Sequence, residues 1–228
     1  MNDGPSIATV GALIGDHARA SILCTLLDGQ TRTATELSHR AGVSASTASA
    51  HLTKLVDGRL LAVEKQGRHR FYRLASAEIG QMLETMLAVS DASIPTNKIE
   101  RRNQELRAGR MCYDHIAGRL GVALTDSLIE RNSVTITGKT IELTDSGKLF
   151  FRRLGIDVEA VRKRRRKFAD YCIDWSERRP HLSGALGEAL ATHCVKNKWI
   201  YRLPDTRAVR ITPKGRQEMK IAFSLSLD

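Results

Sequence analysis

The stretch VSASTASAHLTKLVDGRLL (residues 43–61), followed by VEKQGRHRFYRL (residues 63–74), decides the fold of the first third of this 228-residue chain. Ser44 is expected to be the N-cap of a helix that runs to about Leu55, because a serine hydroxyl accepts the free amide hydrogens of a first turn. Two segments, 60–65 and 68–74, flank Gln66-Gly67 in the pattern of a β-hairpin. The quoted stretch therefore predicts a helix followed by a hairpin.

Other helices are predicted on either side of this stretch. Residues 6–28 carry apolar side chains at spacings of three and four and end at Asp28-Gly29. A second helix is expected over residues 35–40, with Gly42 just past its end, and a last one over residues 76–89. Helix, short turn, helix and basic hairpin is the arrangement of a winged helix-turn-helix, in which one helix enters the major groove of DNA.

The candidate DNA contacts lie on the outer face of the 44–55 helix and on the hairpin. Short side chains let a helix approach base edges, and basic residues of a hairpin reach phosphates. A solvated helix face would explain the hydroxyl residues alone, but the hairpin that follows favours DNA reading. The predicted contacts are Ser44, Ser46, Thr47, Ser49, Ala50, His51, Lys54, Arg68, His69 and Arg70.

The two quoted segments resemble the core of ArsR/SmtB-type winged-helix repressors, and the resemblance covers residues 6–87. It implies that the 44–55 helix is the recognition helix, that the first and last helices form a homodimer, and that an effector relieves repression. Members often have an arginine directly before the recognition-helix histidine, whereas Ala50 precedes His51 here. Metal-sensing members carry cysteines on the second helix, but residues 32–37 read RTATEL, so that metal site is absent. Cys24 is expected in the core.

Composition narrows the class of protein. The formal net charge is +11 and 42% of the residues are hydrophobic, which suits a nucleic-acid partner and allows two cores. The four cysteines form no Cys-x-x-Cys pair, and no leader or membrane span is evident, so a cytoplasmic protein with reduced thiols and no membrane partner is expected. Without a phosphate-binding glycine loop, a nucleophile elbow or an HExxH motif, the chain is not expected to be an enzyme.

The C-terminal part contains an internal repeat. HIAGRLG (115–121) matches HLSGALG (181–187), and each copy continues as a helix, a short hairpin and a closing helix that starts at TDSG (144–147) or TPKG (212–215). The fold is therefore predicted to be mainly α with small β-hairpins. Its domains are a winged helix-turn-helix over 1–89, a linker over 90–108, and a sensor domain over 109–228. The sensor domain consists of two degenerate winged-helix-like repeats, about 109–157 and 172–228.

Four residues near the starts of the repeats are the candidate sensor: Cys112, His115, Cys172 and His181. Cys112 and His115 are three residues apart and are expected to share a helix face. Core cysteines with helix-orienting histidines are the favoured interpretation. A thiol or disulfide switch and a tetrahedral site for zinc or another thiophilic metal are the alternatives. For the last two, the repeats must pack with these residues facing one another.

Neighbouring residues leave further alternatives open. Asp114 and Asp174 each follow a cysteine by two positions. They are either hydrogen-bond acceptors for a ligand histidine or residues at the start of a helix. An organic effector between the repeats, near Tyr113, Trp175 and Arg178, is a third possibility. The run RKRRRK (162–167) is either a solvated loop or a second phosphate contact.

The combined prediction is a homodimeric transcriptional regulator, a repressor that binds an inverted-repeat operator in double-stranded DNA. Its affinity for DNA is expected to change when an effector, which the sequence does not identify, acts on the C-terminal domain. The rival is a winged-helix protein-interaction module without sequence-specific DNA reading. The basic hairpin argues against that rival.

Overall fold

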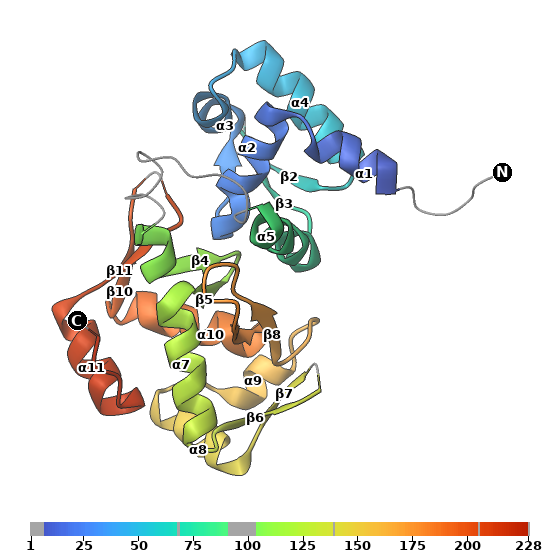
Figure 1. Ribbon diagram of the computed structural model, residues 1–228. Helices are drawn as coiled ribbons and strands as arrows, with labels where there is room; N and C mark the ends of the chain where they lie inside the picture. The colour runs from blue at the N-terminus through green and yellow to red at the C-terminus, as the bar shows by residue number, and fades with distance from the viewer. Residues whose placement is uncertain (1–6, 68, 91–103, 139, 205, 228) are drawn as a thin grey trace. The chain divides into compact units, whose positions relative to one another are not determined.

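The chain folds into two units, residues 1–83 and 84–228, and each is described by itself (Figure 1). The computed structural model describes residues 7–67, 69–90, 104–138, 140–204 and 206–227. Most of the predicted linker over 90–108 lies outside the described residues, and its last part, 104–108, is helical.

The first unit contains the predicted helix-turn-helix and hairpin. Its strands form one antiparallel sheet in the order β1-β3-β2, in which Lys65 lies opposite Arg70. The elements are α1 (Ile7–Ile14), α2 (His17–Thr25), the 3-10 helix η1 (Leu26–Asp28), β1 (Arg32–Thr33), α3 (Ala34–Ala41), α4 (Ala45–Asp57), β2 (Leu61–Gln66) and β3 (His69–Leu74). Helix α5 (Ala77–Ser90) begins in the first unit and crosses the boundary at residue 83.

Local capping explains where α3 and α4 begin and end. Thr33 and Glu36 form a capping box at the start of α3, and Gly42 ends that helix with a φ of 66°. The hydroxyl of Ser44 accepts the amide hydrogen of Thr47 at 3.2 Å, as expected of the N-cap of α4. The inward face of α4 carries Ala48, Leu52 and Leu55, which are fully buried. The predicted recognition helix is therefore fixed at its start and along one side.

The predicted single helix over residues 6–28 is wrong. It breaks at Gly15, and the two helical pieces lie at 87° to each other. Asp16 caps the second piece, because its carboxylate accepts the amide hydrogen of Arg19 at 2.9 Å. Among the described residues no single helix is long and apolar enough to cross a membrane, although this bent pair would pass on length and composition together.

In the second unit, hairpin, helix, hairpin and helix occur twice in the same order (Figure 1). The first set is β4 (Arg110–Cys112), β5 (His115–Ala117), α7 (Gly118–Glu130), β6 (Val134–Thr137), β7 (Thr140–Leu143) and α8 (Asp145–Arg153). After α9 (Val158–Arg162), the second set is β8 (Asp170–Ile173), β9 (Pro180–Ser183), α10 (Gly184–Lys196), β10 (Ile200–Arg202), β11 (Val209–Ile211) and α11 (Pro213–Phe223). A mainly α fold with small β-hairpins is confirmed, while the winged-helix-like character of each repeat stays a prediction.

The two repeats pack against each other through α7 and α10. A methyl group added to Gly121 of α7 would lie 3.7 Å from Cβ of His181, and one added to Gly187 of α10 would lie 3.2 Å from Cβ of His115. Each central helix therefore contacts the histidine-bearing strand of the other repeat. Both repeats contribute to one apolar core, which includes Leu120, Phe151, Leu186 and Phe223.

The closing helices need glycine in their first turn. A Cβ atom at Gly215 of α11 would overlap the carbonyl oxygen of Trp199, just as one at Gly147 of α8 would overlap that of Ser133. We expect Gly215→Ala to destabilise the second unit by about 1–3 kcal/mol, because backbone must move to admit the methyl group. Gln217→Ala, at an exposed position of α11, is the control and should change stability by less than about 0.5 kcal/mol. Urea unfolding measures both, and equal stability of the two variants would contradict this packing.

Candidate nucleic-acid interface and buried Cys-His cluster

The outward face of α4 is exposed over most of the predicted contact residues. Ser44, Ser46, Thr47, Ser49, Ala50 and Lys54 are all exposed. The hydroxyl of Ser44 lies 2.9 Å from that of Ser46 and 2.8 Å from that of Thr47. This face presents small side chains and short hydroxyls, so its backbone can approach another surface closely.

His51 differs from the other predicted contacts. Its side chain is only 16% exposed, and Nδ1 lies 3.2 Å from Nη1 of Arg19 and 3.8 Å from a carboxylate oxygen of Asp16. Arg19 itself also donates to the carbonyl oxygens of Leu13 and Ala12. His51 thus contacts Arg19 in the first turn of α2 and the N-cap residue Asp16 of that helix.

The described part of the wing carries exposed basic side chains on β2 and β3. His69 and Arg70 are exposed on β3, and exposed Lys65 faces Arg70 from β2. Arg73 makes an ion pair with Glu64 at 2.8 Å. The predicted contact Arg68 lies outside the described residues. Among the described wing residues, Arg70, His69 and Lys65 are therefore exposed and able to contact a phosphate.

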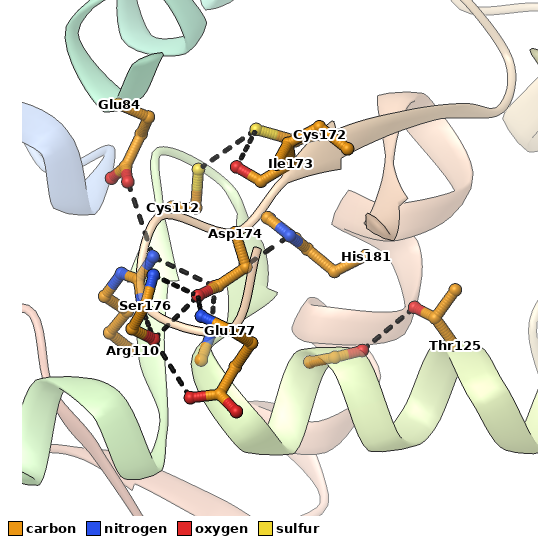
Figure 2. Close-up of polar contacts among 12 residues, drawn as sticks. Glu84, Arg110, Cys112, Thr125, Cys172, Ile173, Asp174, Ser176, Glu177 and His181 are labelled. Atoms are coloured by element: carbon orange, nitrogen blue, oxygen red, sulfur yellow. Dashed lines mark hydrogen bonds and ion pairs between the residues drawn. The ribbon is translucent and has the colours of Figure 1, made fainter. Parts of the chain in front are cut away.

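In the second unit, the four candidate sensor residues meet in one buried cluster. The ligand atoms of Cys112, His115, Cys172 and His181 all lie within 4.8 Å of one another, and all four residues are buried. The two Sγ atoms are 4.0 Å apart (Figure 2), and the two Nε2 atoms are 3.2 Å apart. The Sγ distance and the free state of both cysteines show thiols in proximity without a disulfide.

The expected helical placement of Cys112 and His115 is wrong. They are cross-strand neighbours in the β4–β5 hairpin, which turns through Tyr113 and Asp114, and Tyr113 has a φ of 60°. Cys172 and His181 are cross-strand neighbours in the β8–β9 hairpin. Each hairpin thus presents one thiol and one imidazole side by side, because directly opposite residues of an antiparallel pair project on the same face.

An aspartate lies beside the outward nitrogen of each histidine. Nδ1 of His115 lies 3.1 Å from a carboxylate oxygen of Asp114, and Nδ1 of His181 lies 4.0 Å from one of Asp174. Asp114 also accepts a hydrogen bond from Arg166. Burial raises the pKa of Asp114, but the hydrogen bonds from His115 and Arg166 outweigh it and hold that pKa below its usual value.

Asp174 is the most densely bonded side chain of this region (Figure 2). It accepts from the amide of Gly118 at 2.6 Å and from the hydroxyl of Ser176 at 2.7 Å, and it pairs with the buried Arg110 at 2.9 Å. Burial opposes its charge, yet Arg110, Ser176 and these amide hydrogens lower its pKa to about 2. Arg110 also lies over the buried ring of Trp175, 4.6 Å from its centroid, so Trp175 serves the packing of Arg110.

The two thiols differ in acidity because each one affects the other. The hydrogen bond between them and burial raise the pKa of Cys112. The same hydrogen bond, with His115 and His181, lowers the pKa of Cys172 below its usual value against the opposing effect of burial. Cys194, which lies outside the cluster, has its pKa raised to about 12 by burial alone. The cluster therefore favours a thiolate, whereas an ordinary core site disfavours one.

The basic run at residues 162–167 finds acidic and aromatic partners within the second unit. Arg164 and Arg166 both pair with Glu188, and Lys167 pairs with Asp170. Arg162 lies over the ring of Phe168, 3.9 Å from its centroid. These contacts favour the solvated-loop interpretation, because four of the six cations already have a partner.

Sequence reasoning missed Arg110 and Arg166, which hold the two aspartates. Arg166 was visible only as part of a charge run, and Arg110 carried no local signal. The recurrence of Asp114 and Asp174 two residues after each cysteine indicated the carboxylates beside the two histidines, but not the arginines that pair with them.

A helix-turn-helix domain model matches residues 14–64 of the chain. An uncharacterized HTH-type transcriptional regulator of Bacillus subtilis (strain 168), YdfF, is 43% identical over 225 residues, 98% of each chain. The HTH-type transcriptional regulator Rv0324 of Mycobacterium tuberculosis is 28% identical over 85 residues, 37% of each chain.

Solved structures resemble the N-terminal part. HlyU from Vibrio cholerae is 33% identical and covers 35% of this chain and 82% of its own, with a TM-score of 0.33. The transcriptional repressor BigR from Xylella fastidiosa is 23% identical and covers 36% and 84%, with a TM-score of 0.34. The match to YdfF extends over nearly the whole of both chains, so the second unit is shared as well. The chain belongs to the HTH-type transcriptional regulators, as the resemblance of its N-terminal segments to ArsR/SmtB-type repressors predicted.

Proposed function

We propose that the chain is a homodimeric repressor that binds an inverted-repeat operator through α4 and the wing. The observation that carries this proposal is the exposed face of α4, where small hydroxyl side chains and Lys54 lie in one helix-turn-helix unit with the exposed Arg70 of the wing. A recognition helix reads base edges in the major groove, and a wing meets phosphates.

Unsatisfied apolar surface supports a dimer through the first and last helices. The sequence of α1 is IATVGALI, yet none of its residues is buried within the chain. On α5, Val89 is 74% exposed and Met86 is 45% exposed. An apolar helix in which no residue is fully buried gains stability when a second copy covers it. Two recognition helices would then address two half-sites about one turn of DNA apart.

Thr47→Ala tests the recognition face. If Thr47 makes a base contact, the substitution should reduce discrimination between operator and random DNA by about 1–3 kcal/mol. Thr140→Ala, at an exposed threonine of β7 in the second unit, is the matched control and should leave discrimination unchanged. Fluorescence anisotropy with operator and scrambled duplexes measures both. Unchanged discrimination for Thr47→Ala together with Ser46→Ala and Ser49→Ala would favour the protein-interaction module.

Arg70→Ala tests the wing. Loss of one phosphate contact should weaken binding to all sequences alike and reduce the slope of log affinity against log salt by about 1. Lys220→Ala removes the same charge from an exposed position of α11 and should leave the slope unaltered. The wing assignment fails if the two substitutions change the slope equally, because the effect would then come from net charge alone.

We further propose that the Cys-His cluster of the second unit controls DNA affinity. Its support is the convergence of two thiols and two imidazoles, with Cys172 favoured as a thiolate, in a domain added to a complete winged helix. Oxidants and thiophilic metals both react with thiolates.

The operator affinity of the parent chain is measured in the presence of a reductant, an oxidant or a chelator. It should differ at least tenfold between two of these three conditions. A Cys112→Ser/Cys172→Ser variant should lose that response, and Cys194→Ser should keep it. If the double variant responds as the parent does, control lies elsewhere in the chain.

A further inference from the structure

We propose that Cys112, His115, Cys172 and His181 bind one zinc ion in a closed tetrahedral site that joins the two repeats of the second unit. This inference concerns the same cluster but does not rest on its proposed control of DNA affinity, since it states only which ion the interior of residues 84–228 holds. It also assigns to the cluster a resident ion, where the sequence alone favoured ordinary core cysteines.

The separations of the ligand atoms match tetrahedral zinc. Zinc lies about 2.3 Å from sulfur and about 2.0–2.1 Å from nitrogen, so a tetrahedral ion places two sulfurs about 3.8 Å apart and two nitrogens about 3.3–3.4 Å apart. The Sγ atoms of Cys112 and Cys172 are 4.0 Å apart, and the Nε2 atoms of His115 and His181 are 3.2 Å apart. The same geometry places each sulfur about 3.5 Å from each nitrogen. All four ligand atoms lie within 4.8 Å of one another, so the largest separation to close is about 1.3 Å.

The orientation of the two imidazoles also suits a metal. Both Nε2 atoms point into the cluster, and both Nδ1 atoms point outward toward carboxylates, those of Asp114 and Asp174. A histidine that ligates zinc through Nε2 commonly donates its Nδ1 hydrogen to a carboxylate, which fixes the tautomer and the ring. Arg166 and Arg110 hold the two carboxylates in place.

Two neutral imidazoles without an ion cannot satisfy this arrangement. A hydrogen bond between the Nε2 atoms needs one of them to carry a hydrogen, and that ring then presents a bare Nδ1 to its aspartate. An additional proton would give an imidazolium, which could pair with a Cys172 thiolate in place of a metal site, and the metal analysis below distinguishes these two states. A zinc ion takes both Nε2 lone pairs and leaves a hydrogen on each Nδ1. That of His115 lies 3.1 Å from Asp114, while the buried Nδ1 of His181 lies 4.0 Å from Asp174 and has no hydrogen-bond partner among the described residues.

Charge and burial point to a structural ion. Two thiolates balance the two charges of zinc, and each neighbouring aspartate is paired with an arginine. Four protein ligands leave no open position for substrate, as is usual for a structural site. Each hairpin supplies one cysteine and one histidine, so the ion connects segments 60 residues apart in sequence. Its binding energy would therefore stabilise the packing of the two repeats.

The test measures metal in the full chain purified under reducing conditions. Elemental analysis by mass spectrometry should find about one zinc per chain in the parent and in Cys194→Ala. The zinc content of the Cys112→Ala/Cys172→Ala variant should be at least tenfold lower than that of the parent. Cys194 is the matched control, because it is a buried cysteine of the same unit outside the cluster.

A second measurement needs no variant and so does not depend on whether the double variant folds. Cobalt(II) added to the chelator-treated parent should give the intense visible absorption of a tetrahedral ion, with charge-transfer bands from two thiolates, and zinc should displace it. Absence of both bound zinc and this spectrum would overturn the proposal. So would zinc that stays in the double variant, or a Cys112–Cys172 disulfide found by mass spectrometry in the metal-free chain under reducing conditions.

Discussion

The second unit depends on burying two Cys-His pairs face to face. Nonpolar packing alone would not place four polar side chains in an interior, because a buried polar group without a partner costs free energy. Here the cost is offset by a layered arrangement in which thiols and imidazoles face one another, aspartates lie behind the imidazoles, and arginines hold the aspartates. The glycines at 121 and 187 contribute to this packing, since a Cβ atom there would overlap the carbonyl oxygens of Ile116 and Leu182 in the histidine-bearing strands of their own repeats.

In the first unit, the ends of two helices follow from capping residues that are recognisable in the sequence. Thr33, Gly42 and Ser44 set the ends of α3 and α4 through caps that depend only on near neighbours in the chain. Apolar spacing then fixes which face of α4 is buried. The same reasoning failed at Gly15 and Asp16, where the apolar stripe continues across a break and Asp16 forms a cap instead. The spacing of apolar residues indicates which face of a helix is apolar. It does not reveal a bend across which the same spacing continues.

The hairpins of the second unit could not be predicted in the same way. β4 and β5 have three residues each, too few to show an alternation, and their turn places Tyr113 at positive φ without a glycine to signal it. The repeat in the sequence nevertheless identified the four residues that meet, because equivalent positions of two similar units related by rough symmetry face each other. What the repeat could not supply was the supporting layer. Arg110 and Arg166 do not occupy equivalent positions of the two repeats. Each meets its aspartate, Asp174 or Asp114, only because the chain folds distant segments together.

Charge in the two units has different physical roles. Most of the net positive charge falls after residue 87, which on composition alone would place the nucleic-acid contact there. The structure uses much of that charge internally, with Arg164 and Arg166 on Glu188, and Arg166 also on the aspartate that lies behind His115. Cations committed to such pairs release fewer counterions on meeting a phosphate, so they add little to DNA affinity. The nearly neutral first unit carries fewer cations, but Lys54 in the last turn of α4 and Arg70 on the wing are exposed. Under the proposed DNA-binding role, the exposure of cations next to the recognition helix matters more than the total charge.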